Sequence, residues 1–105
     1  MSEETTVTEK ATLVVTALPN TDDMSSVQEY LHGVMPLFVA AGGTLVKRLK
    51  VDQVINGSPS GMAMVMDFDS AEAINDLFAS PEYAELLPLR DRGFTDMNIL
   101  ITQEM

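Results

Sequence analysis

The sequence contains no cysteine and no tryptophan, and its only histidine is His32. Without cysteine, the chain has no thiol nucleophile, no disulfide and no thiolate ligand for zinc or an iron–sulfur cluster. A single imidazole likewise excludes a site in which several histidines of one chain hold a metal. We therefore expect no metal and no cofactor, and a fold that is stabilised by packing.

Positively charged residues are also scarce, because six Lys and Arg stand against sixteen Asp and Glu, which gives the 105 residues a net charge of −10. Such a surface repels nucleic-acid phosphates, whose partners normally present clusters of Lys and Arg. Apolar runs such as residues 62–66 fall far short of the roughly 20 residues of a membrane span. Residues 1–10 lack the basic and apolar segments of a secretion signal. We therefore expect a soluble, cytoplasmic protein with neither a nucleic-acid nor a membrane partner.

Hydrophobic residues make up 46% of the chain, which is enough to form one packed core in a protein of this length. Residues 1–10 are rich in Glu and Thr and show no apolar periodicity, a composition that is typical of a flexible N-terminal tail. The remaining residues, 11–105, are expected to form a single domain.

The first part of this domain predicts a strand followed by a helix. Residues 11–18 are rich in β-branched side chains and end at a Pro-Asn turn, as strands often do. Residues 24–41 carry apolar side chains at three- and four-residue spacing, which places them on one face of a helix. Asn20 or Thr21 is the predicted cap of this helix, and Pro36 is expected to kink it.

Two further strands are predicted around a turn. Residues 44–55 have a strand-like pattern, and the sequence NGSPSG at residues 56–61 favours an antiparallel hairpin with residues 62–68. Methionines at every second position of the latter strand are compatible with a soft metal site or an adaptable ligand surface. The period of two instead favours packing in a core or a dimer. This row consists of Met62, Met64 and Met66.

The last part predicts helices and a closing strand. Ser70 and Ser80 each precede a helical pattern as caps, and Pro88 is expected to end or bend the second of these helices. Residues 96–102 form the closing strand. The resulting order βαββαβ is that of an α+β ferredoxin-like domain. Because helices cover only one face of such a sheet and both faces are largely apolar, we predict a homodimer in which the two sheets form an α/β barrel.

Several short segments also match a known family, and the spacing between Phe68 and Arg90 contains no gaps. The matching residues are Tyr30, Pro36, Gly42, Gly43, Arg48, Phe68, Ser70, Ala71, Glu72, Ala73, Ser80, Pro81, Glu82, Tyr83, Leu86, Leu89 and Arg90. In these residues the sequence resembles domain of unknown function 1330, an uncharacterised family within the ferredoxin-like superfamily of dimeric α/β barrels. The resemblance implies the fold, a dimer and an unknown activity. Superfamily relatives such as cofactor-independent monooxygenases and chlorite-dismutase-like enzymes suggest small-molecule chemistry.

Arg48 is the strongest candidate for a functional residue. It lies in a predicted strand, matches the family and can hold a carboxylate or phosphate with its planar guanidinium. The alternative is a structural ion pair with Asp67 on the neighbouring strand, which hairpin geometry permits. Asp67 and Asp69 share a strand face and are compatible with acid–base work or a hard metal, but two acids at a strand end are commonplace.

Tyr30, Tyr83 and Arg90 are further candidates, since a Tyr–Arg pair can polarise a ligand. Their alternative role is structural, with the tyrosines packing helices on the sheet and Arg90 meeting acids or helix carbonyls. His32 is a candidate general base, but it has no visible partner, so a surface position or a place at the dimer seam is the favoured interpretation.

Two functions remain open from the sequence. The first is binding of a small anionic or polar metabolite in a pocket of the barrel, with or without cofactor-free catalysis. Arg48 forms the floor of this pocket, and Tyr30, Asp67 and Tyr83 lie at its border. The second is a non-catalytic interaction or regulatory module that acts as an acidic homodimer. An enclosed cavity with an Arg48 side chain that is free of Asp67 favours the first function, and a filled barrel with an Arg48–Asp67 bond favours the second.

Overall fold

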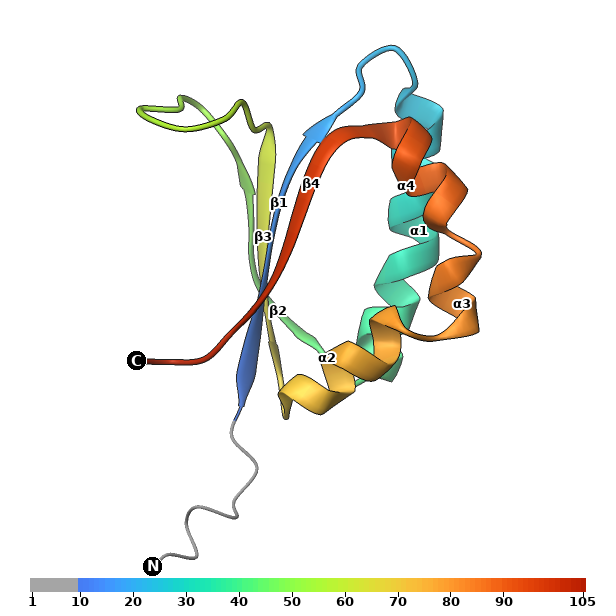
Figure 1. Ribbon diagram of the computed structural model, residues 1–105, viewed down its shortest axis with the longest axis vertical. Helices are drawn as coiled ribbons and strands as arrows, with labels where there is room; N and C mark the ends of the chain where they lie inside the picture. The colour runs from blue at the N-terminus through green and yellow to red at the C-terminus, as the bar shows by residue number, and fades with distance from the viewer. Residues whose placement is uncertain (1–9) are drawn as a thin grey trace, which may run out of the picture.

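The computed structural model describes residues 10–105, which form a four-stranded antiparallel sheet with helices on one face (Figure 1). The predicted flexible tail, apart from Lys10, lies outside the described residues. The strands are β1 (Ala11–Pro19), β2 (Thr44–Lys50), β3 (Met62–Phe68) and β4 (Phe94–Thr102). The helices are α1 (Met24–Ala40), α2 (Ala71–Phe78), α3 (Pro81–Ala84) and α4 (Leu87–Gly93).

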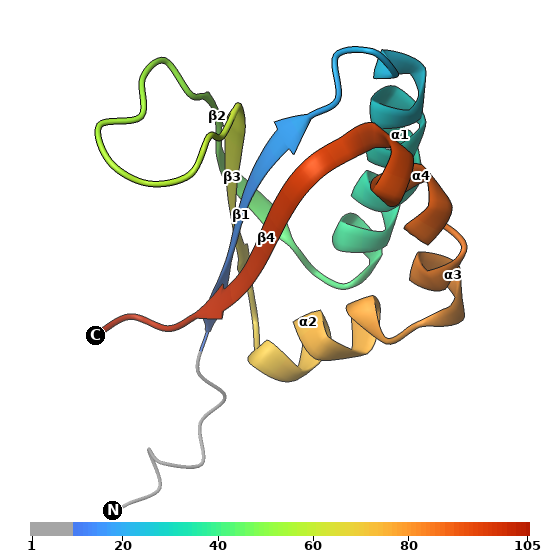
Figure 2. The same ribbon diagram turned by 45° about the horizontal axis from the view of Figure 1, so that its top comes forward.

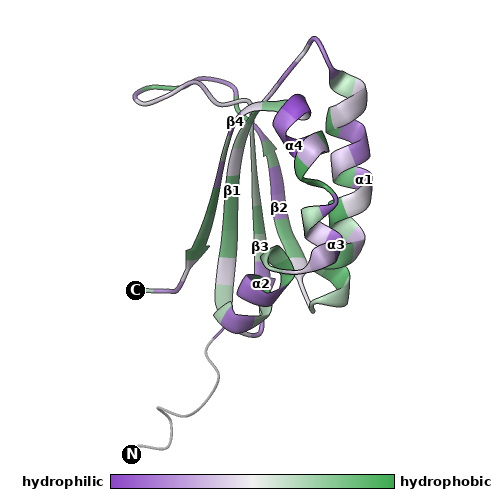
Figure 3. Cartoon of the chain, turned by 45° about the vertical axis from the view of Figure 1, so that its right-hand side comes forward, coloured by the Kyte–Doolittle hydropathy of each residue, from purple (hydrophilic) through white to green (hydrophobic). Residues whose placement is uncertain are grey.

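The strands lie in the order β2–β3–β1–β4, and every neighbouring pair is antiparallel. This is the predicted ferredoxin-like α+β arrangement. β1 and β3 are hydrophobic along most of their length (Figure 3), and alternate residues of each are buried beneath the helices. Met64 and Met66 belong to this buried set, as the packing interpretation predicts for them, whereas Met62 is only partly buried.

All six aromatic side chains of the protein form one continuous chain of edge-to-face contacts in the core. Their ring centroids lie between 4.8 and 6.2 Å apart. Each such pair stabilises a fold by about 0.5–1.5 kcal/mol beyond the burial of its area. This series of aromatic contacts therefore connects the helical layer with the sheet. Its members in order are Phe68, Phe38, Phe78, Tyr83, Tyr30 and Phe94.

Helix α1 begins later than its predicted caps. Asp23 is the N-cap instead of Asn20 or Thr21, because its carboxylate accepts hydrogen bonds from both the backbone N–H and the hydroxyl of Ser26. These bonds favour the ionised form and lower the pKa of Asp23. Pro36 lies inside α1 without ending it.

Strand β2 is shorter than the predicted strand 44–55. It ends at Lys50, and the following loop, which includes the NGSPSG turn, projects from the sheet on the side away from the helices (Figures 1 and 2). A β-bulge between Leu45 and Lys47 interrupts β2, so that the strand register places Arg48 directly opposite Met64. Because Met64 is buried under the helices, Arg48 also lies on the helical side of the sheet.

Pro88 begins a helix rather than ending one, which corrects the prediction for this segment. It lies in the first turn of α4, where backbone N–H groups have no acceptor within the helix, so the missing N–H of proline costs no hydrogen bond. Strand β4 consequently starts at Phe94, before the predicted residues 96–102. Helix α4 is only seven residues long, too short to show an apolar periodicity.

Candidate functional site

A groove of about 1100 Å³ runs between α1 and the edge strand β2. No residue of β2 is buried, so this strand extends beyond the helical layer and leaves the groove open along α1. The helix contributes side chains along one of its sides, and β3 contributes two methionines. The apolar residues of the lining are Leu31, Met35, Pro36, Val39, Met62 and Met64.

Within the part of the chain that the structure describes, Arg48 is the one Lys or Arg side chain that lines this groove, where His32 and Glu29 lie as well. The predicted alternative, an ion pair with Asp67, does not form. Asp67 lies opposite Thr12 on the other sheet face and accepts a hydrogen bond of 2.8 Å from the Thr12 hydroxyl. Among residues 10–105, no carboxylate lies within ion-pairing distance of Arg48.

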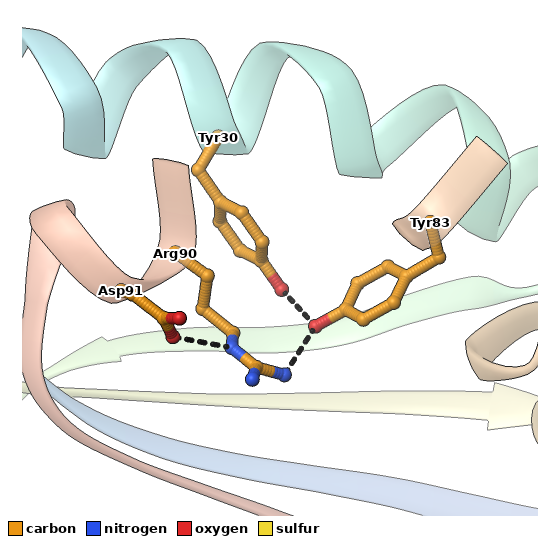
Figure 4. A network of polar contacts seen from close by, with 4 residues as sticks. All are labelled: Tyr30, Tyr83, Arg90 and Asp91. Atoms are coloured by element: carbon orange, nitrogen blue, oxygen red, sulfur yellow. Dashed lines mark hydrogen bonds and ion pairs between the residues drawn. The ribbon is translucent and has the colours of Figure 1, made fainter. Parts of the chain in front are cut away.

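Tyr30, Tyr83 and Arg90 form a separate cluster, which joins α1, α3 and α4 (Figure 4). The two tyrosine hydroxyls lie 2.8 Å apart, and Arg90 Nη1 donates to the Tyr83 hydroxyl at 3.3 Å. Arg90 Nε also lies 3.6 Å from Asp91 Oδ1. The structure therefore brings together three of the five predicted ligand-binding residues, and Arg48 and Asp67 lie elsewhere, on opposite faces of the sheet.

Burial determines what this cluster can do chemically. Tyr30 and Tyr83 are only 4% and 3% exposed, so both hydroxyls are shielded from solvent. Burial and the hydrogen bond to Tyr83 raise the pKa of Tyr30 far above its ordinary value, which keeps it protonated. Partial burial disfavours the charged form of Arg90, but the hydrogen bond to Tyr83 and the Asp91 carboxylate outweigh this effect and raise the pKa of Arg90.

Arg90 is the part of the cluster that reaches a surface hollow. Its side chain is 31% exposed and lines a cleft of about 370 Å³ beside β4. Asp91 and Asp96 line the same cleft, so two carboxylates surround one guanidinium there. A small anion therefore meets less favourable charge at Arg90 than at Arg48.

Sequence reasoning missed Glu29, Ser25 and Gln28 as groove residues. The three side chains are exposed on α1, where polar residues normally indicate a solvated helix face. Their spacing with His32 at three to four residues was the available signal, because it places all four on one side of the helix.

Two classes of site find no support within the described part of the chain. No three His, Asp or Glu side chains of residues 10–105 gather closely enough to hold a metal ion. In the same residues, no helix combines the length and the apolar character that crossing a membrane requires.

The sheet order and the one-sided helical layer define a ferredoxin-like α+β protein with an open groove at one sheet edge. The family model of the domain of unknown function DUF1330 matches residues 11–105, and the chain belongs to this family. No functionally curated protein matches the chain.

Solved structures with the same fold come from distant relatives. A protein of unknown function from Rhodopseudomonas palustris has a TM-score of 0.78 at 14% identity, covering 92% of this chain and 83% of its own. The hydroxynitrile lyase from Passiflora edulis has a TM-score of 0.70 at 13% identity, with 92% and 94% covered. A protein from Bacteroides fragilis that is described as dimeric and ferredoxin-like has a TM-score of 0.60 at 9% identity, with 90% and 96% covered. These likenesses concern the fold.

Proposed function

We propose that this protein binds a small organic anion in the groove between α1 and β2, with Arg48 as the residue that holds the acidic group. One observation carries the proposal: Arg48 lies on the helical side of the sheet, in a mainly apolar groove, without a carboxylate partner among residues 10–105. A guanidinium in such surroundings favours a carboxylate or phosphate, which it can hold with two parallel hydrogen bonds. Mostly apolar pockets with a few polar groups are typical ligand sites.

The groove also contains an imidazole, the side chain that most often acts as a general acid or base in enzymes. His32 lines it from α1, on the same helix side as Glu29. A reaction at this site would use His32 as its acid or base and would need no cofactor. The fold hosts an enzyme in the Passiflora edulis lyase, but fold alone does not assign a reaction.

The proposal includes a cytoplasmic homodimer. The sheet face opposite the helices carries apolar side chains that a single copy leaves partly exposed, among them Leu49 at 47% and Leu100 at 50%. When a second copy of this chain packs on this face with its own equivalent face, the exposed apolar side chains of both copies are covered, as in a two-fold symmetric interface. Similar proteins from Bacteroides fragilis and Thermobifida fusca are described as dimeric. The groove lies on the other side of the sheet and stays accessible in this dimer.

A thermal-shift titration tests the ligand proposal. The probes are benzoate, octanoate and inorganic phosphate, and the proteins are the wild type, Arg48→Gln and Lys47→Gln. Lys47→Gln is a matched control, because it removes one charge from the same strand but lies opposite Val65, on the other sheet face. A ligand at about 100 times its dissociation constant adds about 2.7 kcal/mol to the free energy of unfolding.

We expect at least one carboxylate to stabilise the wild type and Lys47→Gln to the same extent. Its apparent affinity for Arg48→Gln should be at least tenfold lower. Equal stabilisation of Arg48→Gln would refute the assignment of Arg48. No response to any probe would instead favour the interaction module, whose partner would then be sought by affinity capture.

A further inference from the structure

On the α1 side, the groove changes from mostly polar residues at one end to apolar residues at the other, and this asymmetry extends the proposed function, on which the following inference rests. Its polar side chains come from the N-terminal half of α1, namely Ser25, Gln28, Glu29 and His32. Its apolar side chains from the C-terminal half include Met35 and Val39. A ligand that fills the groove must therefore have one polar and one apolar end.

Arg48 lies at the polar end. Strand β2 follows α1 through a short turn at Gly42 and Gly43, so its first residues lie beside the end of the helix. The strand then runs back in the direction opposite to α1 while diverging from it (Figure 1), and Arg48 is the fifth of its seven residues. Met64, directly opposite Arg48, and Met62 line the groove beside the cation, and on α1 the apolar lining continues through Met35 to Val39 near the end of the helix.

The groove is also long. Its lining extends from Ser25 to Ala40, which corresponds to roughly 22 Å of helix at about 1.5 Å per residue. A compact metabolite occupies only part of this length. Met35, Met62 and Met64 line the groove, and methionine side chains adapt to flexible apolar chains.

We infer that the ligand class is that of free long-chain monocarboxylic acids, with the carboxylate on Arg48 and the alkyl chain directed toward the C-terminal end of α1. A single negative charge fits better than two, because Glu29 lines the polar end and repels a dianion. Each methylene group of the alkyl chain that leaves water adds to the affinity until the groove is filled.

Isothermal titration calorimetry with butanoate, octanoate and dodecanoate, each below its micelle concentration, tests this inference. We expect the affinity for the wild type to rise at least tenfold from each acid to the next. Arg48→Gln should weaken dodecanoate binding at least tenfold, whereas Glu29→Gln should strengthen it. In amide NMR spectra, dodecanoate should shift resonances at both Arg48 and Val39, and butanoate only those near Arg48.

The outcomes separate this inference from the proposed function. If all three acids bind equally and depend on Arg48, the anion site stands and the inference is overturned. If affinity rises with length but Arg48→Gln has no effect, both are overturned. If no acid binds and Val39→Asp changes the oligomeric state, the groove is an interface between copies of this chain, which overturns both as well.

Discussion

The hydroxyl groups of Tyr30 and Tyr83 lie 2.8 Å apart in the core, although 53 residues separate them in the sequence. Tyr83 occupies the central position of this contact, because its oxygen also accepts a hydrogen bond from Arg90. Removal of the Tyr83 hydroxyl therefore leaves the Tyr30 hydroxyl without this partner and takes an acceptor from Arg90, whereas removal of the Tyr30 hydroxyl leaves Tyr83 bonded to Arg90.

This asymmetry predicts the outcome of a double-mutant cycle. Tyr83→Phe should lower the free energy of unfolding by about 1–3 kcal/mol, because it leaves the buried Tyr30 hydroxyl without its partner. Tyr30→Phe should lower it less, by about 0.5–1.5 kcal/mol. The double variant should cost less than the sum of the two, because both buried hydroxyls disappear together. Urea denaturation of the four proteins measures all three values. Additive losses would show that the hydroxyls do not interact.

Alkaline pH should destabilise the fold through Tyr30. The pKa of Tyr30 is raised in the folded protein, so its contribution to stability is fully present below the ordinary tyrosine pKa of about 10 and is lost as the pH rises above that value. One such group lowers the free energy of unfolding by about 1.4 kcal/mol per pH unit in this range. Denaturation at pH 9–11 measures the slope, which Tyr30→Phe should reduce. An unchanged slope in Tyr30→Phe would contradict the prediction.

Gly43 lies where a side chain would collide with the core. A Cβ atom at this position would lie 2.6 Å from Phe68 Cζ and 2.9 Å from the Phe38 carbonyl oxygen. We expect Gly43→Ala to lower the free energy of unfolding by about 1–3 kcal/mol, because the neighbouring ring and backbone are packed.

Gly33→Ala is the matched control for this variant. Its Cβ would lie 2.6 Å from Leu86 Cδ2, the end of a flexible side chain that can move, and alanine favours the helix by about 1 kcal/mol over glycine. Thermal denaturation should therefore show a clear loss for Gly43→Ala and little change for Gly33→Ala. Equal losses would show that the packing around Gly43 is as adaptable as that around Leu86.

The proposed dimer makes a prediction for the open sheet face. Leu100→Glu places a charge opposite Val14 on that face and should produce a monomer, whereas Val39→Glu on the helical side should not. Because each copy has a net charge of −10, added salt should tighten the wild-type dimer by screening their repulsion. Analytical ultracentrifugation measures both effects. A wild type that stays monomeric at all concentrations would exclude the dimer.

Most of the strands and helices can be identified from the sequence, because the features that mark them involve residues close together in the chain. β1 and β3 follow from alternation and β-branched residues, and the serine caps at Ser70 and Ser80 both bond the predicted backbone N–H groups. The short helix α4 lacks such a signal. Its place depends on packing against α1, which a local pattern does not report.

The site was less predictable for the same reason. The family resemblance selected Tyr30, Tyr83 and Arg90, but their mutual hydrogen bonds depend on how three helices meet. In a regular strand Arg48 and Val46, two residues apart, would lie on the same face, but the bulge in β2 breaks this alternation. A bulge shifts every following side chain to the other face, and its position depends on the partner strand.

The bulge also determines how this strand should be aligned with relatives. Val46 is the unpaired residue, so a homologue that lacks it keeps Leu45 opposite Met66 and the residue equivalent to Arg48 opposite Met64. A gap at Val46 is therefore structurally neutral, whereas a gap between Lys47 and Lys50 would move the arginine to the other sheet face. A homologue's arginine should accordingly be equated with Arg48 by its distance from the β2–β3 turn, and not by its distance from Gly43.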